Sequence, residues 1–147
     1  MMIRRMTSED VKQVAEIEEQ CFSVPWSRQG FLDSIAREDT IFLVAKEEVS
    51  DKIMGYIGMY MSFEEGEITN VAVSLEYRNQ GIGARLVRAI QLAGKERNLE
   101  RIILEVRISN ASALSLYKGN GFEELGIRKN FYEKPVEDAI IMSYMVK

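Results

Sequence analysis

The chain contains no histidine among its 147 residues, and this absence excludes more chemistry than any other feature of the sequence. Without histidine neither a Ser-His nor a Cys-His catalytic pair can form, and metal sites that use imidazole ligands are excluded too. Any proton transfer must use a carboxylate, a tyrosine, a lysine, water or the substrate itself. We therefore expect no metal and no activated nucleophile.

Cysteine is scarce as well, because Cys21 is the only one and no internal disulfide can form. It falls on an apolar helical face, which favours a place in the core over a nucleophilic role. No apolar run approaches the roughly 20 residues that cross a membrane, and the N-terminal stretch lacks the apolar segment of a signal peptide. These absences predict a cytoplasmic protein that does not associate with membranes.

Length and composition predict a single domain over residues 1–147. Hydrophobic residues make up 46% of the chain and charged residues 29%, as in ordinary globular domains. The net charge of −4 argues against nucleic-acid binding, which depends on neutralising phosphates. The expected assembly is a monomer or a weak dimer.

The order of apolar segments predicts an α/β (α+β) fold with a mostly antiparallel sheet of six to seven strands and helices on both faces. Short turns, including a charged one at 64–67, imply antiparallel neighbours. A polar and aromatic loop is expected at 128–132. The predicted strands cover 3–6, 41–45, 53–61, 68–73, 101–106, 122–127 and 138–146, and the predicted helices cover 8–22, 27–36, 82–97 and 111–118.

The sequence is organised around residues 68–90, where a strand leads through a glycine-rich loop into a helix. The first amides of such a helix lack intrahelical partners and favour an anion. A dinucleotide fingerprint is excluded because Leu86 stands where its third glycine is needed, and no Gly-Lys-Ser/Thr of a P-loop is present. The pattern predicts a phosphate-binding loop, with an ordinary helix start as the alternative.

Two further residues, Glu105 and Trp26, allow two readings each. Glu105 interrupts an apolar strand, either at an edge where Arg101 or Arg107 pairs with it or as a base that lines a cleft. Trp26, beside a proline between two helices, either closes the core or faces a substrate. Asn110 has the position of a helix N-cap.

The loop from Arg78 to Gly83 resembles the Arg/Gln-x-x-Gly-x-Gly/Ala signature of the GNAT superfamily of N-acetyltransferases. Other motifs stand in the same order as in its RimI branch: Pro25-Trp26-Ser27, Leu104-Glu105-Val106-Arg107, Asn110-Ala111, Leu116-Tyr117, Gly121-Phe122, 128–132 and 138–142. The chain is therefore identified as similar to that branch, whose members acetylate the N-terminal alanine of ribosomal protein bS18. The resemblance covers nearly the whole chain.

The resemblance implies an acyltransferase of GNAT fold that uses acetyl-CoA as cosubstrate and bS18 or a similar N-terminal peptide as acceptor. It implies Glu105 as general base and Tyr117 as general acid. The expected substrate-binding residues are Trp26, Tyr132 and Asp138. Acetyl-CoA is expected to contact Val71, Ala72, Val73, Arg78, Asn79, Gln80, Gly81, Ile82, Gly83, Ala84, Asn110 and Tyr117.

The expected reaction is direct attack of the amine in a ternary complex. An N-terminal amine has a pKa of about 8, so a base such as Glu105 is needed at neutral pH. The Val73 amide is expected to stabilise the oxyanion, and Tyr117 to protonate the departing thiolate. Two alternatives stay open: acetylation of a lysine or a small amine on the same scaffold, and a non-catalytic acyl-CoA-binding module.

Overall fold

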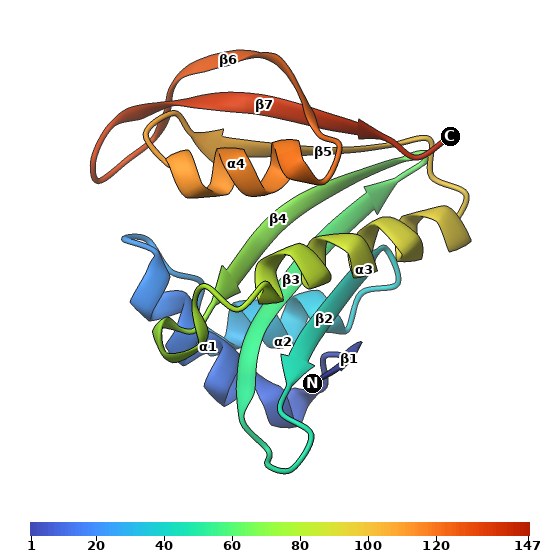
Figure 1. The fold of residues 1–147 in the computed structure, drawn as a ribbon, viewed down its shortest axis with the longest axis vertical. Helices are drawn as coiled ribbons and strands as arrows, with labels where there is room; N and C mark the ends of the chain where they lie inside the picture. The colour runs from blue at the N-terminus through green and yellow to red at the C-terminus, as the bar shows by residue number, and fades with distance from the viewer.

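Seven strands form one sheet in the computed structural model, which describes residues 1–147 (Figure 1). The spatial order of the strands is β1-β2-β3-β4-β5-β7-β6. The strands are β1 Met2–Arg5, β2 Thr40–Lys46, β3 Ile53–Ser62, β4 Glu65–Val73, β5 Arg101–Arg107, β6 Glu123–Tyr132 and β7 Glu137–Met145, and the helices are α1 Val11–Cys21, α2 Arg28–Ile35, α3 Ile82–Glu96 and α4 Ala111–Gly119. Two short 3₁₀ turns lie at Ser8–Asp10 and Leu75–Tyr77.

Every neighbouring pair of strands is antiparallel except β4 and β5, so the predicted mostly antiparallel sheet is confirmed. The parallel pair needs a long crossover, and α3 supplies it. The predicted caps form as well: the Ser27 side chain accepts a hydrogen bond from the Gly30 amide at the start of α2. Asn110 accepts one from the Ala113 amide at the start of α4.

Helices cover both faces of the sheet, as predicted, and each face has its own core. In Figure 1, α3 and α4 lie on the near side of the sheet, and α1 and α2 lie behind it. The larger core joins α3 and α4 to β2–β5 and β7, and it includes Leu86, Ile90 and Leu104. The smaller core joins α1 and α2 to β2–β4 around Phe31 and Tyr56. No helix of the chain is both long enough and apolar enough to cross a membrane.

Strands β4 and β5 separate soon after they begin. They pair at only three positions, the last being Glu67 opposite Ile103. Just beyond, Thr69 is an extra residue in β4 relative to β3 and forms a β-bulge. A bulge bends its strand and increases the local twist, so β4 turns away from β5. Figure 1 shows the two strands diverging toward their C-terminal ends.

The bulge also reverses which side chains of β4 face which helices. Ile68 belongs to the core under α3, so Glu67 faces the side of α1 and α2. After the extra residue, Asn70 contacts α1 and Ala72 joins the core under α1 and α2. Val71 and Val73 then pack toward α3. One inserted residue therefore decides which β4 side chains surround the site described below.

Two segments predicted as turn or loop are strand. Glu65 begins β4 instead of belonging to a turn at 64–67, and residues 128–132 continue β6 instead of forming a loop. Strand β6 is exposed along almost its whole length, so no apolar alternation marks it in the sequence. Its pairing with β7 holds it in the sheet, with an irregular stretch between Arg128 and Tyr132.

A buried polar network joins α1 to the sheet. The Glu18 carboxyl group is almost completely buried and accepts hydrogen bonds from the Tyr56 hydroxyl on β3, the Trp26 amide (2.9 Å) and the Asn70 side chain (3.4 Å). Burial and the neighbouring Glu18 raise the pKa of Tyr56, so its hydroxyl keeps the proton that it donates. The network ties the connection between α1 and α2 to β4 just after the bulge.

We expect the Tyr56→Phe substitution to lower the free energy of unfolding by about 1.5–3 kcal/mol, because it leaves a buried carboxyl group short of a donor. Urea denaturation followed by circular dichroism measures this loss. The control is Tyr60→Phe, whose hydroxyl bonds the neutral Ser34 hydroxyl at 2.6 Å, and about 0.5–1.5 kcal/mol is expected for it. A Tyr56→Phe loss no larger than that of the control would contradict the importance of the Glu18 network.

Candidate active site

The edge of β4 that faces β5 carries free backbone groups. The Ser74 amide donates to the Met54 carbonyl of β3 at 2.8 Å. Since alternate residues of an antiparallel strand bond to the same neighbour, Ala72 also bonds to β3, and Val71 and Val73 direct their backbone groups to the opposite edge. That edge has no strand partner beyond Glu67. It can accept an extended ligand as an additional strand.

The facing edge of β5 is free in the same way. The Ile108 amide donates to the Asp138 carbonyl of β7 at 3.1 Å, so the alternation directs the backbone groups of Glu105 and Arg107 away from β7. They point to the side of β4, which has already turned away. The divergence therefore leaves two unpaired strand edges facing one another.

The loop before α3 presents a run of free amides. None of the backbone N–H groups of residues 79–84 donates a hydrogen bond within the chain, and the first bond of the helix runs from the Arg85 amide to the Gly81 carbonyl. Asn79 and Gly81 both have a left-handed backbone, with φ of 63° and 77°. A Cβ atom at Gly81 would meet nothing within 4 Å, so the space beside the loop is open. Free amides and a helix N-terminus make an anion site.

Two contacts hold this loop in place. The Arg78 guanidinium donates to the Val73 carbonyl (3.4 Å) and to Cys21 Sγ (3.2 Å), which links the loop to the ends of β4 and α1. Gly83 lies against α4, because a Cβ atom there would be 3.3 Å from Leu116 Cδ2. Of the two glycines, Gly81 supplies the backbone conformation and Gly83 the close helix packing.

Glu105 lies in the interior of the sheet, which rules out the edge reading of this residue. Its strand runs between β4 and β7. Leu104 and Val106 point into the core under α3, so Glu105 points to the other face and is half-buried there. The two arginines considered as partners are bound elsewhere, since Arg101 pairs with Glu65 and Arg107 with Glu137.

The carboxyl group that meets Glu105 is Glu67 of β4. Burial, and then the like charge of Glu67, raises the pKa of Glu105 above its ordinary value. The Arg128 guanidinium acts in the opposite direction. Glu105 thus has the environment of a general base whose pKa is moved toward neutral pH.

Tyr132 stands beside Glu105 at the end of β6. Arg107 positions it: the guanidinium lies 4.5 Å from the centre of the Tyr132 ring and donates to the Glu133 and Pro135 carbonyls and to Glu137. Burial, then the Glu105 charge, raises the pKa of Tyr132 to about 12, against the effect of Arg107. Its hydroxyl is therefore protonated at neutral pH.

Tyr117 lies on the other face of the sheet. It is 5% exposed, belongs to the core under α3 and α4, and packs its ring against Phe122 at 5.6 Å. Burial, then the nearby Tyr132, raises its pKa well above the ordinary value. Tyr132 thus neighbours both Glu105 and Tyr117, and the two residues expected to move protons lie on opposite faces of the sheet.

Three other predicted site residues have structural contacts of their own. The Trp26 ring packs on Phe31 at 5.3 Å and on Phe42 at 6.2 Å, which makes it part of the smaller core with one side accessible. The Asn110 side chain caps α4. Asp138 Oδ1 accepts a hydrogen bond from the Asn130 amide at 2.9 Å and so shapes the irregular part of β6.

Sequence reasoning counted Glu67 only among several acidic groups that could meet a basic peptide, and it did not foresee that Glu67 lies beside Glu105 or that Arg107 positions Tyr132. Glu67 looked like one of several charges in a turn, and only the register of β4 against β5 brings it to Glu105. Arg107 looked like a possible counter-ion for Glu105, but it binds the hairpin between β6 and β7. The one usable signal was the pair Glu65 and Glu67, whose spacing of two puts both on one face of a strand.

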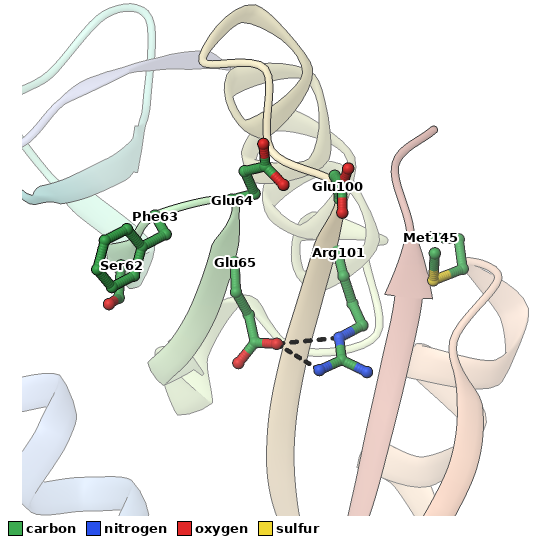
Figure 2. A pocket seen from close by; sticks show the side chains of 7 residues that line it. All are labelled: Ser62, Phe63, Glu64, Glu65, Glu100, Arg101 and Met145. Atoms are coloured by element: carbon green, nitrogen blue, oxygen red, sulfur yellow. Dashed lines mark hydrogen bonds and ion pairs between the residues drawn. The ribbon is translucent and has the colours of Figure 1, made fainter.

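Two cavities lie along this part of the sheet. One, of about 380 Å³, lies where β4 and β5 begin to separate and is lined by Asp39, Tyr60, Glu67 and Ile103, among others. The larger one, of about 470 Å³, lies at the closed end of the two strands, where Figure 2 shows Glu65 bound to Arg101 (Nε to Oε2, 3.0 Å). The smaller cavity is the one that adjoins the Glu67–Glu105 pair.

Comparisons with known proteins agree with this geometry. Residues 11–122 match the model of the Acetyltransferase (GNAT) family. The [ribosomal protein bS18]-alanine N-acetyltransferase of Escherichia coli is 30% identical, covering 96% of this chain and 95% of its own. A Bacillus subtilis protein to which that activity is provisionally assigned is 37% identical, covering 95% of this chain and 92% of its own.

Solved structures give the same result for the fold. The crystal structure of the Escherichia coli ribosomal-protein-S18-alanine N-acetyltransferase superimposes with a TM-score of 0.90 at 29% identity, covering 99% of this chain and 94% of that one. Ard1 from Thermoplasma volcanium also gives a TM-score of 0.90, at 27% identity, covering 99% of this chain and 97% of that one.

Proposed function

This chain belongs to the GNAT family of acetyltransferases, and we propose that it transfers the acetyl group of acetyl-CoA to the N-terminal alanine of ribosomal protein bS18. The observation that carries the choice of acceptor is the similarity, over nearly the full length of both chains, to proteins named for that activity. The open edges of β4 and β5 supply a place where an acyl donor and a peptide amine can meet.

Acetyl-CoA fits the anion site and the free edge of β4. Its pyrophosphate would be held by the free amides of residues 79–84 at the positive end of α3. Its pantetheine amides would bond the outward backbone groups of Val71 and Val73. When bound, it supplies an acetyl thioester. The Val73 amide, which has no partner in the chain, is placed to stabilise negative charge on the thioester oxygen.

The acceptor amine would approach on the face that carries Glu105. Most acidic groups near this face already have partners, because Glu137 binds Arg107 and Ser109, Asp138 binds Asn130, and Glu65 binds Arg101. Neither Glu67 nor Glu105 forms a salt bridge, although the charge of Arg128 acts on Glu105. An acceptor with a cationic N-terminus matches this local excess of negative charge.

The proton transfers divide between the two faces of the sheet. Glu105, directly or through water, takes the proton that the substrate ammonium must lose before it attacks. Tyr117 keeps its proton at neutral pH and can give it to the departing thiolate, whose thiol has a pKa of about 8.5. No enzyme nucleophile is involved, so both substrates must be bound together.

The function is tested with peptides that begin Ala-Arg, each paired with the same peptide blocked at its N-terminus. We expect acetyl transfer to the free peptides only, as measured by mass spectrometry, because the site receives an α-amine. Label on internal lysines of the blocked peptides would identify a lysine acetyltransferase instead. Binding of acetyl-CoA without transfer to any amine would identify a non-catalytic acyl-CoA-binding module.

The phosphate loop is tested with two substitutions of Gly81. Valine is β-branched and cannot adopt the left-handed backbone without strain, whereas asparagine tolerates it. We therefore expect Gly81→Val to raise the KM for acetyl-CoA by about tenfold or more, as the amides of the loop move. The Gly81→Asn variant should stay within a few-fold of wild type. Equal KM values for both variants, each with an unchanged melting temperature, would show that the loop does not bind the pyrophosphate.

The two proton carriers are tested by the pH dependence of their variants. Glu105→Gln cannot accept a proton, so its rate near neutral pH should fall by ~10²-fold or more. Raising the pH should recover part of this loss, because more of the substrate amine is then already neutral. Tyr117→Phe should also depress turnover, without recovery at high pH and with little change in acetyl-CoA affinity. Rates near wild type for both variants across the pH range would contradict the assignment.

A further inference from the structure

Glu67 has a position that the acetyl-transfer scheme above does not use. It is the last residue of β4 that pairs with β5, and Glu105 lies two residues beyond its partner Ile103. Both side chains point to the face away from α3, and both are half-buried. Because the bulge at Thr69 follows at once, Glu67 is the last β4 side chain on this face before the strands separate.

The register places the two carboxyl groups on adjacent strands and on the same face of the sheet. Two like charges in a half-buried site cannot both ionise as easily as one. Glu105 therefore holds its proton to a higher pH than an isolated carboxyl group, because burial and then the charge of Glu67 raise its pKa.

The other charged groups around the pair do not neutralise it. Arg101 on β5 pairs with Glu65, and Arg107 binds Glu137 and the backbone of the β6–β7 hairpin. Arg128 of exposed β6 faces Glu105 and also lies 5.8 Å from the Phe131 ring. Tyr132, also on β6, is protonated at neutral pH. Asp39 and Tyr60 line the cavity beside Glu67, and Asp39 is paired with Arg37. No helix packs on this face over β5.

We propose that Glu67 is a positioning residue for Glu105: at the point where β4 leaves β5, it sets a second carboxyl group beside Glu105 on the face that receives the substrate amine, and it acts on the reaction through Glu105. This inference rests on the proposed function, because it assigns the pair of carboxyl groups to the site of the α-amine. The arriving ammonium group is a cation that both negative side chains attract. Glu105 then takes one proton from the ammonium nitrogen, which leaves that nitrogen a lone pair for the attack.

The test is the pH at which Glu105 titrates in the free enzyme, followed by the NMR signal of its carboxyl carbon. The signal is assigned by its loss in Glu105→Gln. Because a negative neighbour holds the proton on Glu105 to higher pH, its removal should let Glu105 ionise at lower pH. We expect Glu67→Gln to lower the midpoint by on the order of one pH unit. Glu67→Asp, which keeps the charge, should retain most of the elevated value.

Glu65→Gln is the matched control, since Glu65 lies on the same strand and face but binds Arg101. It should leave the Glu105 midpoint unchanged. A midpoint that is the same in wild type and Glu67→Gln, or that moves equally in Glu65→Gln, would overturn the proposal. This measurement needs no substrate, so it stands even if the enzyme acetylates no N-terminal peptide.

The pH profile of kcat/KM gives the second readout. A base must be ionised to act, so activity falls as the pH drops through its pKa. Removal of Glu67 lowers that pKa, and the acid limb of Glu67→Gln should move to lower pH, so the variant keeps more of its activity than wild type under mildly acidic conditions. Activity lowered equally at every pH would indicate a structural role, and a loss as large as that of Glu105→Gln would make Glu67 the base. Either result would refute the positioning role.

Discussion

The early end of the pairing between β4 and β5 is the constraint on which the rest of this structure depends. Three residue pairs join the strands, and the bulge at Thr69 then turns β4 away. Had the ladder continued, the backbone groups of Val71, Val73 and Glu105 would bond to each other and would be unable to bind anything else. Because the sheet stays continuous at the closed end, where Glu65 binds Arg101, the opening needs no separate domain and no hinge (Figure 2).

An opening in the middle of a sheet leaves polar groups exposed, and the surrounding elements hold its two sides at a fixed separation. On one side, Glu18 connects α1 to β3 and to β4 just past the bulge. On the other side, Arg107 binds the hairpin between β6 and β7 at three acceptors. Both anchors make several hydrogen bonds each, which specify one arrangement better than apolar packing alone.

Features that depend on burial could be predicted from the sequence, and features that depend on register could not. The strand at 41–45 was predicted correctly because β2 is buried on both faces, and the strand at 101–106 because every second residue of β5 is buried in the core under α3. The predicted strand ended at residue 127, five residues before the end of β6, because neither face of β6 is covered and its residues do not alternate between apolar and polar. Glu105 could be singled out from the sequence because it is a charged residue in an apolar strand. Glu67 could not, because only the parallel pairing of β4 with β5 brings it beside Glu105.

The two faces of the sheet offer a reason why acid and base can coexist in so small a site. As the proposed base, Glu105 must lose its proton to work, and as the proposed acid, Tyr117 must keep its own. A carboxylate in direct contact with the tyrosine would hold that proton by a hydrogen bond and oppose its release. Here Tyr132 stands between them, itself protonated and held by Arg107. The pKa of Glu105 is thus raised by burial and by a second carboxyl group, whereas that of Tyr117 is raised by burial in an apolar core and by Tyr132.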